Sequence, residues 1–150
     1  MITISAEVVI DAPIECVWRA IVDVNSYHEW NPLIRSAHGE PILGSRIEML
    51  ICPPGLMSRS ASVEVLAIET QREFRWLGRW GLPRILDGEH SFFVHALNST
   101  QTQVTQTETF SGILARPLAA IVIPRMKQGF EAMNSALKAR CEGLAERGRQ

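Results

Sequence analysis

Apolar and polar residues alternate along several segments of this chain, which is the pattern of strands with one buried face. In residues 2–10, apolar residues stand at every second position and are separated by Thr3, Ser5 and Glu7. The same alternation predicts further strands at residues 33–40, 45–52, 58–70, 72–79, 88–97 and 101–111. Short connections with Gly, Pro or Asn separate most of them, so we expect hairpins and a seven-stranded antiparallel sheet.

The chain ends in a long segment with helical periodicity, residues 117–145. One face of this helix carries Met126, Phe130, Met133, Leu137, Cys141 and Leu144. Pro124 and Gly129 interrupt the pattern, so residues 117–123 form either a separate segment or a kinked first turn. Two interpretations of this break stay open: it forms a gate over a pocket, or it lets the helix follow the curvature of the sheet. A long amphipathic helix after many strands indicates a sheet wrapped around it, with room for a cavity between them.

Two short helices are predicted between the first two strands. Asp11 is expected to cap the first helix, with Pro13 in its first turn. A second helix is expected over Val24–Trp30, ended by Pro32. The resulting order of elements predicts an α+β fold formed by a single domain over residues 1–150.

Residues 88–111 predict a hairpin whose register follows from its loop. With residues 98–100 as the loop, His90 lies opposite Glu108. The same register places Phe92 opposite Gln106 and Val94 opposite Val104. The threonine-rich face is expected to meet solvent, and a slip of one residue would reverse both faces. The inward set is then His90, Phe92, Val94, Val104, Gln106, Glu108 and Phe110.

Composition and charge narrow the range of functions. With 21% charged residues and a net charge of −1, the chain has no basic surface of the kind that binds nucleic acid. Its longest apolar run, residues 118–123, is too short to span a bilayer, so we expect no integral membrane association. Three scattered cysteines favour reduced thiols, and the first residues do not resemble a leader peptide. We therefore expect a cytoplasmic protein, either a monomer or a homodimer.

Several stretches together resemble the START-like or Bet v 1-like (SRPBCC) superfamily, in particular its bacterial members of polyketide cyclase/dehydrase type. The stretches are DAPIECVWRAIVDV, YHEWNPLI, FRWLG followed by GEHSFFV, TQTETFSGIL, and GFEAMNSALKARCE in the closing helix. The resemblance covers nearly the whole chain and implies a helix-grip fold, in which the sheet curls around the last helix. It also implies an interior that admits one small hydrophobic molecule. Unlike the metal-dependent relatives, this chain has no His, Cys and Asp residues at ligand spacing, so we expect no metal and no cofactor.

The inward pair His90 and Glu108 is the strongest candidate for a site. Two ionisable groups that face an apolar interior need each other, water or a ligand as partners. Three interpretations stay open: a structural pair that bridges two strands, a ligand contact, or an acid and base for an aldol-type cyclisation.

Aromatic and methionine residues on the inward faces extend this candidate site. A planar ligand stacks well on such side chains, although packing in a plain core is an equally good explanation. The predicted ligand-binding residues are Trp30, Met49, Phe74, Trp76, Trp80, His90, Phe92, Gln106, Glu108, Phe110, Met126, Phe130 and Met133.

Three functions follow from this sequence. The first is binding of a small hydrophobic or aromatic ligand, similar to a lipid, a quinone or a polyketide, between the sheet and the closing helix. The second is a cofactor-free cyclase or dehydratase that uses His90 and Glu108. The third is an interaction module whose core is filled.

Overall fold

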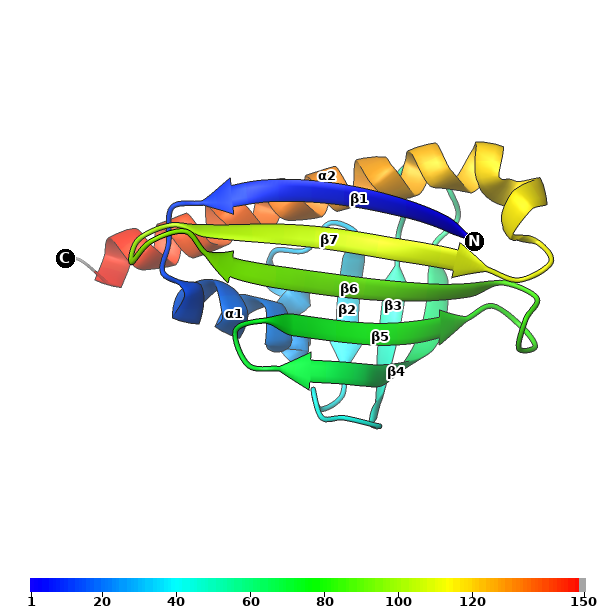
Figure 1. Ribbon diagram of the computed structural model, residues 1–150, viewed down its shortest axis with the longest axis horizontal. Coiled ribbons are helices and arrows are strands. Elements are labelled where there is room, and N and C mark those ends of the chain that lie inside the picture. Colours follow the sequence, from blue (N-terminus) through cyan, green and yellow to red (C-terminus); the bar gives the residue numbers. More distant parts are fainter. Residues whose placement is uncertain (149–150) are drawn as a thin grey trace.

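The protein, represented by a computed structural model, is described over residues 1–148 (Figure 1). Its strands are β1 (Ile2–Ile10), β2 (Ile34–His38), β3 (Arg46–Ile51), β4 (Arg59–Glu69), β5 (Glu73–Arg79), β6 (Asp87–Ala96) and β7 (Thr102–Ser111). Its helices are α1 (Ile14–Val22), the 3-10 helix η1 (Val24–Glu29) and α2 (Ala115–Gly148). The strands form one antiparallel sheet in the order β1-β7-β6-β5-β4-β3-β2. The predicted sequence of elements is confirmed.

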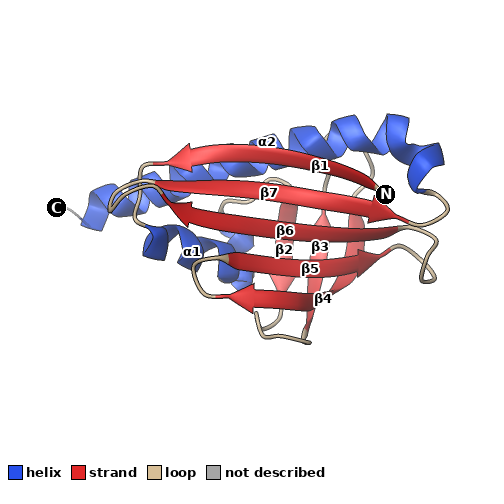
Figure 2. Ribbon diagram, viewed as in Figure 1, coloured by secondary structure: helices blue, strands red, loops and turns tan. Residues whose placement is uncertain are grey.

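The sheet curls around α2 in a helix-grip arrangement. In Figure 2, β2 and β3 run across and behind the plane of β4 to β7, and α2 passes along the same side of the sheet. Because each strand has one apolar face, curling buries that face against the helix. Five predicted inward residues of α2 are buried, and only the sixth, Leu144, is exposed, at 37%.

The hairpin of β6 and β7 has the predicted register. His90 pairs with Glu108, Phe92 with Gln106, and the pairing continues to Asp87 and Ser111. All seven predicted inward residues are buried. Ser91 is an exception on the other face, because it is buried as well.

Helix α2 continues through both residues that interrupt its pattern. The helix is unbroken from Ala115 to Gly148, so residues 117–123 are not a separate segment. Pro124 lies inside it with its side chain exposed. Gly129 is buried, and a Cβ at this position would lie only 2.7 Å from Leu33 Cδ1. The glycine therefore allows close approach between α2 and the segment before β2.

The expected cap at Asp11 is wrong. Helix α1 begins after Pro13 and has no side-chain hydrogen bond at its N-terminus. The Asp11 carboxylate instead accepts a hydrogen bond from Gln101 Nε2 at 2.9 Å. A contact between residues this far apart in the sequence outweighs the local preference for capping.

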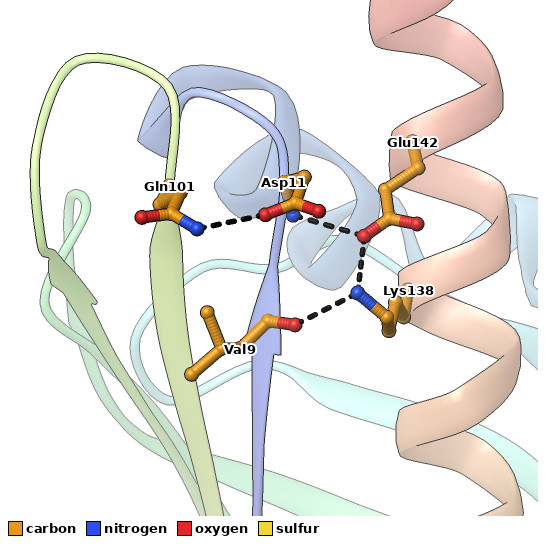
Figure 3. A network of polar contacts seen from close by, with 5 residues as sticks. All are labelled: Val9, Asp11, Gln101, Lys138 and Glu142. Carbon is orange, nitrogen blue, oxygen red and sulfur yellow. Dashed lines mark hydrogen bonds and ion pairs between the residues drawn. The ribbon is translucent and has the colours of Figure 1, made fainter.

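The same residue belongs to a polar network that fixes α2 to β1 (Figure 3). Lys138 Nζ donates to the Val9 carbonyl at 3.1 Å and also to the Glu142 carboxylate. The backbone N–H of Asp11 donates to the same Glu142 oxygen at 3.0 Å. The hydrogen bond from Lys138, together with that from Asp11, lowers the pKa of Glu142 below its ordinary value.

A group whose pKa is lowered by folding stabilises the fold above its unfolded pKa. For Glu142 this contribution is present above pH 4.5 and is lost as pH falls through the lowered pKa. We therefore expect Glu142→Gln to reduce the free energy of unfolding by about 0.5–1 kcal/mol at neutral pH, and by clearly less near pH 3. Urea unfolding at both pH values measures this difference. The matched variant Glu146→Gln, at an exposed position of the same helix, should change little at either pH. An equal loss for Glu142→Gln at both pH values would contradict the assignment.

Candidate ligand-binding site

Two glycines face each other on the inner side of the sheet. Gly78 of β5 pairs with Gly88 of β6, and both are buried. Side chains two positions apart share a face, so Gly78 lies between Trp76 and Trp80, and Gly88 lies beside His90. A glycine inside a strand often marks a place where another group approaches closely. Here the two glycines leave room on the inner face.

The pair His90 and Glu108 occupies this part of the interior. His90 Nδ1 lies 2.8 Å from Glu108 Oε2, and the two side chains are 3% and 12% exposed. The His90 ring stacks on Trp76 at 4.8 Å and meets Phe130 edge to face at 5.0 Å. A Cβ on Gly88 would lie 2.5 Å from Glu108 Oε1, so that glycine makes space for the carboxylate.

The hydrogen-bond roles in this pair follow from the chemistry of its groups. A carboxylate oxygen only accepts, so His90 Nδ1 donates to Glu108. In the neutral ring, a proton on Nδ1 leaves the lone pair on Nε2. His90 Nε2 is buried and has no hydrogen-bond partner among residues 1–148. When the ring is neutral, a ligand that reaches this nitrogen finds an acceptor for a hydroxyl or amine proton.

A small internal cavity lies beside the pair. It encloses about 30 Å³, enough for about one water molecule. Its wall is mainly aromatic and aliphatic, with His90 and Glu108 as its ionisable members.

A larger cleft, which we call the mouth cleft, lies next to the internal cavity and has a volume of about 350 Å³. Trp80 and Met126 line both the mouth cleft and the internal cavity, so these two side chains form the boundary between them. The residues that line the mouth cleft are Pro53, Leu56, Met57, Arg59, Trp80, Leu86, Leu114, Leu118, Val122 and Met126.

A groove of about 500 Å³ lies at the other end of α2, between α1, η1 and the C-terminal turns of α2. Its wall includes four charged side chains, Glu15, Arg19, Asp23 and Arg140. We place the candidate site in the smaller mouth cleft, because that cleft is more apolar and adjoins the His90 pair.

The predicted site residues fall into three groups. Six line the internal cavity or the mouth cleft, namely Trp76, Trp80, His90, Glu108, Met126 and Phe130. Five are buried in the core and line neither, namely Met49, Phe74, Phe92, Gln106 and Met133. Phe110 lines a narrow space beside α2, and Trp30 lines the groove near α1. Gln106 joins β7 to α2 by donating to Asn134 Oδ1.

Several residues of the mouth cleft were not predicted from the sequence. Arg59 and Leu118 are 59 residues apart in the sequence, and no local motif connects them. A signal did exist for the internal cavity, because the inward positions of β5 and β6 include Gly78 and Gly88. Two facing glycines between large aromatic residues indicate an interior that side chains do not fill completely.

Other kinds of site find less support in the described residues. Within residues 1–148, no cluster of three His, Cys, Asp or Glu side chains is arranged to hold a metal ion. Burial raises the pKa of the Cys141 thiol to about 12, which disfavours the reactive thiolate. None of the helices in that part of the chain is long and apolar enough to cross a bilayer.

Comparison with solved structures shows what fold the chain shares. A START superfamily protein from Mycobacterium smegmatis has a TM-score of 0.68 at 17% identity, with 97% of each chain covered. Norcoclaurine synthase from Thalictrum flavum, solved with dopamine and hydroxybenzaldehyde, has a TM-score of 0.70 at 11% identity, with 92% of this chain and 84% of that one covered. A hypothetical protein from Helicobacter pylori has a TM-score of 0.74 at 20% identity, with 92% of this chain and 86% of that one covered.

These identities show a common fold and leave function open. No curated protein sequence matches the chain. A family model described as "Polyketide cyclase / dehydrase and lipid transport" matches residues 1–142. The match covers nearly the whole chain and agrees with the helix-grip architecture, so the protein belongs to the polyketide cyclase/dehydrase and lipid transport family.

Proposed function

We propose that this protein binds a small, mainly apolar molecule in the mouth cleft, with the inner end of the ligand directed toward His90. The observation that carries this proposal is the adjacency of an apolar cleft and a buried histidine nitrogen without a partner. Small-molecule sites combine these two features, an apolar wall for affinity and a few polar groups for orientation.

The size and chemistry of the cleft support the proposal. Its volume of about 350 Å³ lies within the range of about 300–1,000 Å³ typical of small-molecule sites. Burial of an apolar ligand contributes about 25 cal/mol per Å² before the costs of association. Movement of Trp80 or Met126 would open the way to the internal cavity, because both side chains line it. His90 Nε2 then selects a ligand that has a hydroxyl or amine group at its inner end.

Filling the cleft should prevent binding without unfolding the protein. Leu118 is half-buried and lines the cleft, whereas Ile121 on the same helix is 61% exposed. We expect Leu118→Trp to weaken binding of the neutral dye N-phenyl-1-naphthylamine at least about tenfold, because the new ring takes the place of the ligand. Ile121→Trp adds the same ring outside the cleft and should leave binding within about twofold. Dye fluorescence measures affinity, and urea unfolding checks that both variants fold.

The proposal fails if the wild-type protein does not bind the dye, and that result favours an interaction module with a filled core. Equal weakening by the two tryptophan variants would place the dye elsewhere on α2.

A second function is favoured by one observation, the hydrogen bond from His90 Nδ1 to Glu108. A carboxylate in this position orients the ring and stabilises the imidazolium that forms when Nε2 takes a proton. The same pair then serves as the base of a cofactor-free cyclase or dehydratase. The family description includes such enzymes.

A simple carbon acid tests this base. Loss of the C3 proton of 5-nitrobenzisoxazole forms a nitrile, breaks the ring N–O bond and releases a coloured phenolate. If His90 Nε2 takes that proton, wild-type protein accelerates the reaction and His90→Gln loses about a hundredfold or more. Glu108→Gln should also slow it, because the amide no longer stabilises the imidazolium. The matched variant His95→Gln, on the exposed face of β6, should behave as wild type. A wild-type rate equal to that of His90→Gln would refute a catalytic role and leave binding intact.

A further inference from the structure

The mouth cleft has a single charged side chain among the described residues that line it. Nine of its ten lining residues are apolar side chains, and the tenth is Arg59 at the start of β4. An isolated cation beside apolar walls disfavours a ligand that carries a positive charge. It suits a molecule that has an apolar body and one negative group.

The environment of Arg59 leaves its hydrogen-bond donors available. The guanidinium carbon lies 4.1 Å from the centre of the Trp80 ring, so the indole supports one face of the group. The donors of a guanidinium lie in its plane, and stacking on a ring does not use them. Within residues 1–148, Arg59 forms no ion pair with a carboxylate. Stacking therefore holds the guanidinium at the cleft while its edge remains free for an anion.

A second guanidinium lies close to the same wall. Gly55 belongs to the connection between β3 and β4, which contributes Leu56 and Met57 to the cleft. A Cβ on Gly55 would lie 2.6 Å from Arg125 Nη1, so the Arg125 side chain packs on this connection. Its charge adds to the positive potential at the opening without lining the cleft itself.

We infer that the ligand of the mouth cleft is an amphiphile with one anionic group, a carboxylate, sulfonate or phosphate ester, bound by Arg59 at the opening. Its apolar body then extends inward past Trp80 and Met126 toward His90. This inference rests on the proposed function and adds the charge and the orientation of the ligand.

Two molecules of equal size and different charge test it. The probes are 2-naphthylacetate and 2-naphthylacetamide, each measured by displacement of N-phenyl-1-naphthylamine. We expect the carboxylate to bind about five- to tenfold more tightly than the amide at low salt, because it adds a charge-assisted hydrogen bond. Arg59→Gln should remove this preference and leave the amide within about twofold. Arg59→Lys keeps the charge and should retain part of the preference.

A control variant separates a contact with Arg59 from a general effect of positive charge. Lys127→Gln removes an exposed cation from α2 outside the cleft and should leave the preference unchanged. The preference should also shrink in about 0.5 M salt, which screens exposed charges.

Each outcome has a distinct meaning. Equal affinities of wild-type protein for the two probes would overturn the inference, while dye binding would still support the proposed function. A preference that survives in Arg59→Gln would also overturn it. Loss of affinity for both probes in Arg59→Gln would show that Arg59 supports Trp80 rather than the anion. Absence of dye binding to wild-type protein would refute the proposed function and this inference together.

Discussion

Burial of the apolar face of α2 by the curled sheet is the constraint on which the rest of the structure depends. In the middle turns of the helix the apolar face is packed completely, with Phe130, Met133 and Leu137 at most 1% exposed. Nearer the start of the helix, Leu118 and Val122 are only half-buried, and they line the mouth cleft. The inner face of β5 and β6 has glycines at Gly78 and Gly88. The cavity and the cleft therefore lie where helix and sheet do not fill the space between them.

The cost of burying His90 and Glu108 bears directly on the proposed function. Removing two ionisable groups from water costs several kcal/mol, and their attraction offsets this cost only when the geometry is good. Apolar side chains of similar volume would fill the same space without that cost. His90 Nε2 has no hydrogen-bond partner among residues 1–148, and a buried polar atom of this kind is unfavourable unless water or a ligand satisfies it. Under our proposal, a ligand group supplies the missing hydrogen bond.

The sequence predicted the fold well, because strand alternation, hairpin loops and helical spacing are local signals. The pairing of His90 with Glu108 followed from the length of one loop. The cap at Asp11 was wrong, because Gln101 and Glu142 compete for its polar groups from distant parts of the chain. The mouth cleft was not predicted for the same reason. Its wall joins a loop, a strand end and a helix, and their meeting depends on how far the sheet curls.

The most direct test of the central claim is an NMR titration of the methionine methyl groups, labelled with ¹³C, with N-phenyl-1-naphthylamine. Met57 and Met126 line the mouth cleft, whereas Met49 and Met133 are buried in the core at 3% and 0% exposure. Our account predicts that the signals of Met57 and Met126 shift with a common saturation curve, while those of Met49 and Met133 move little. Unchanged signals at Met57 and Met126 in the presence of saturating dye would contradict a ligand site in the mouth cleft.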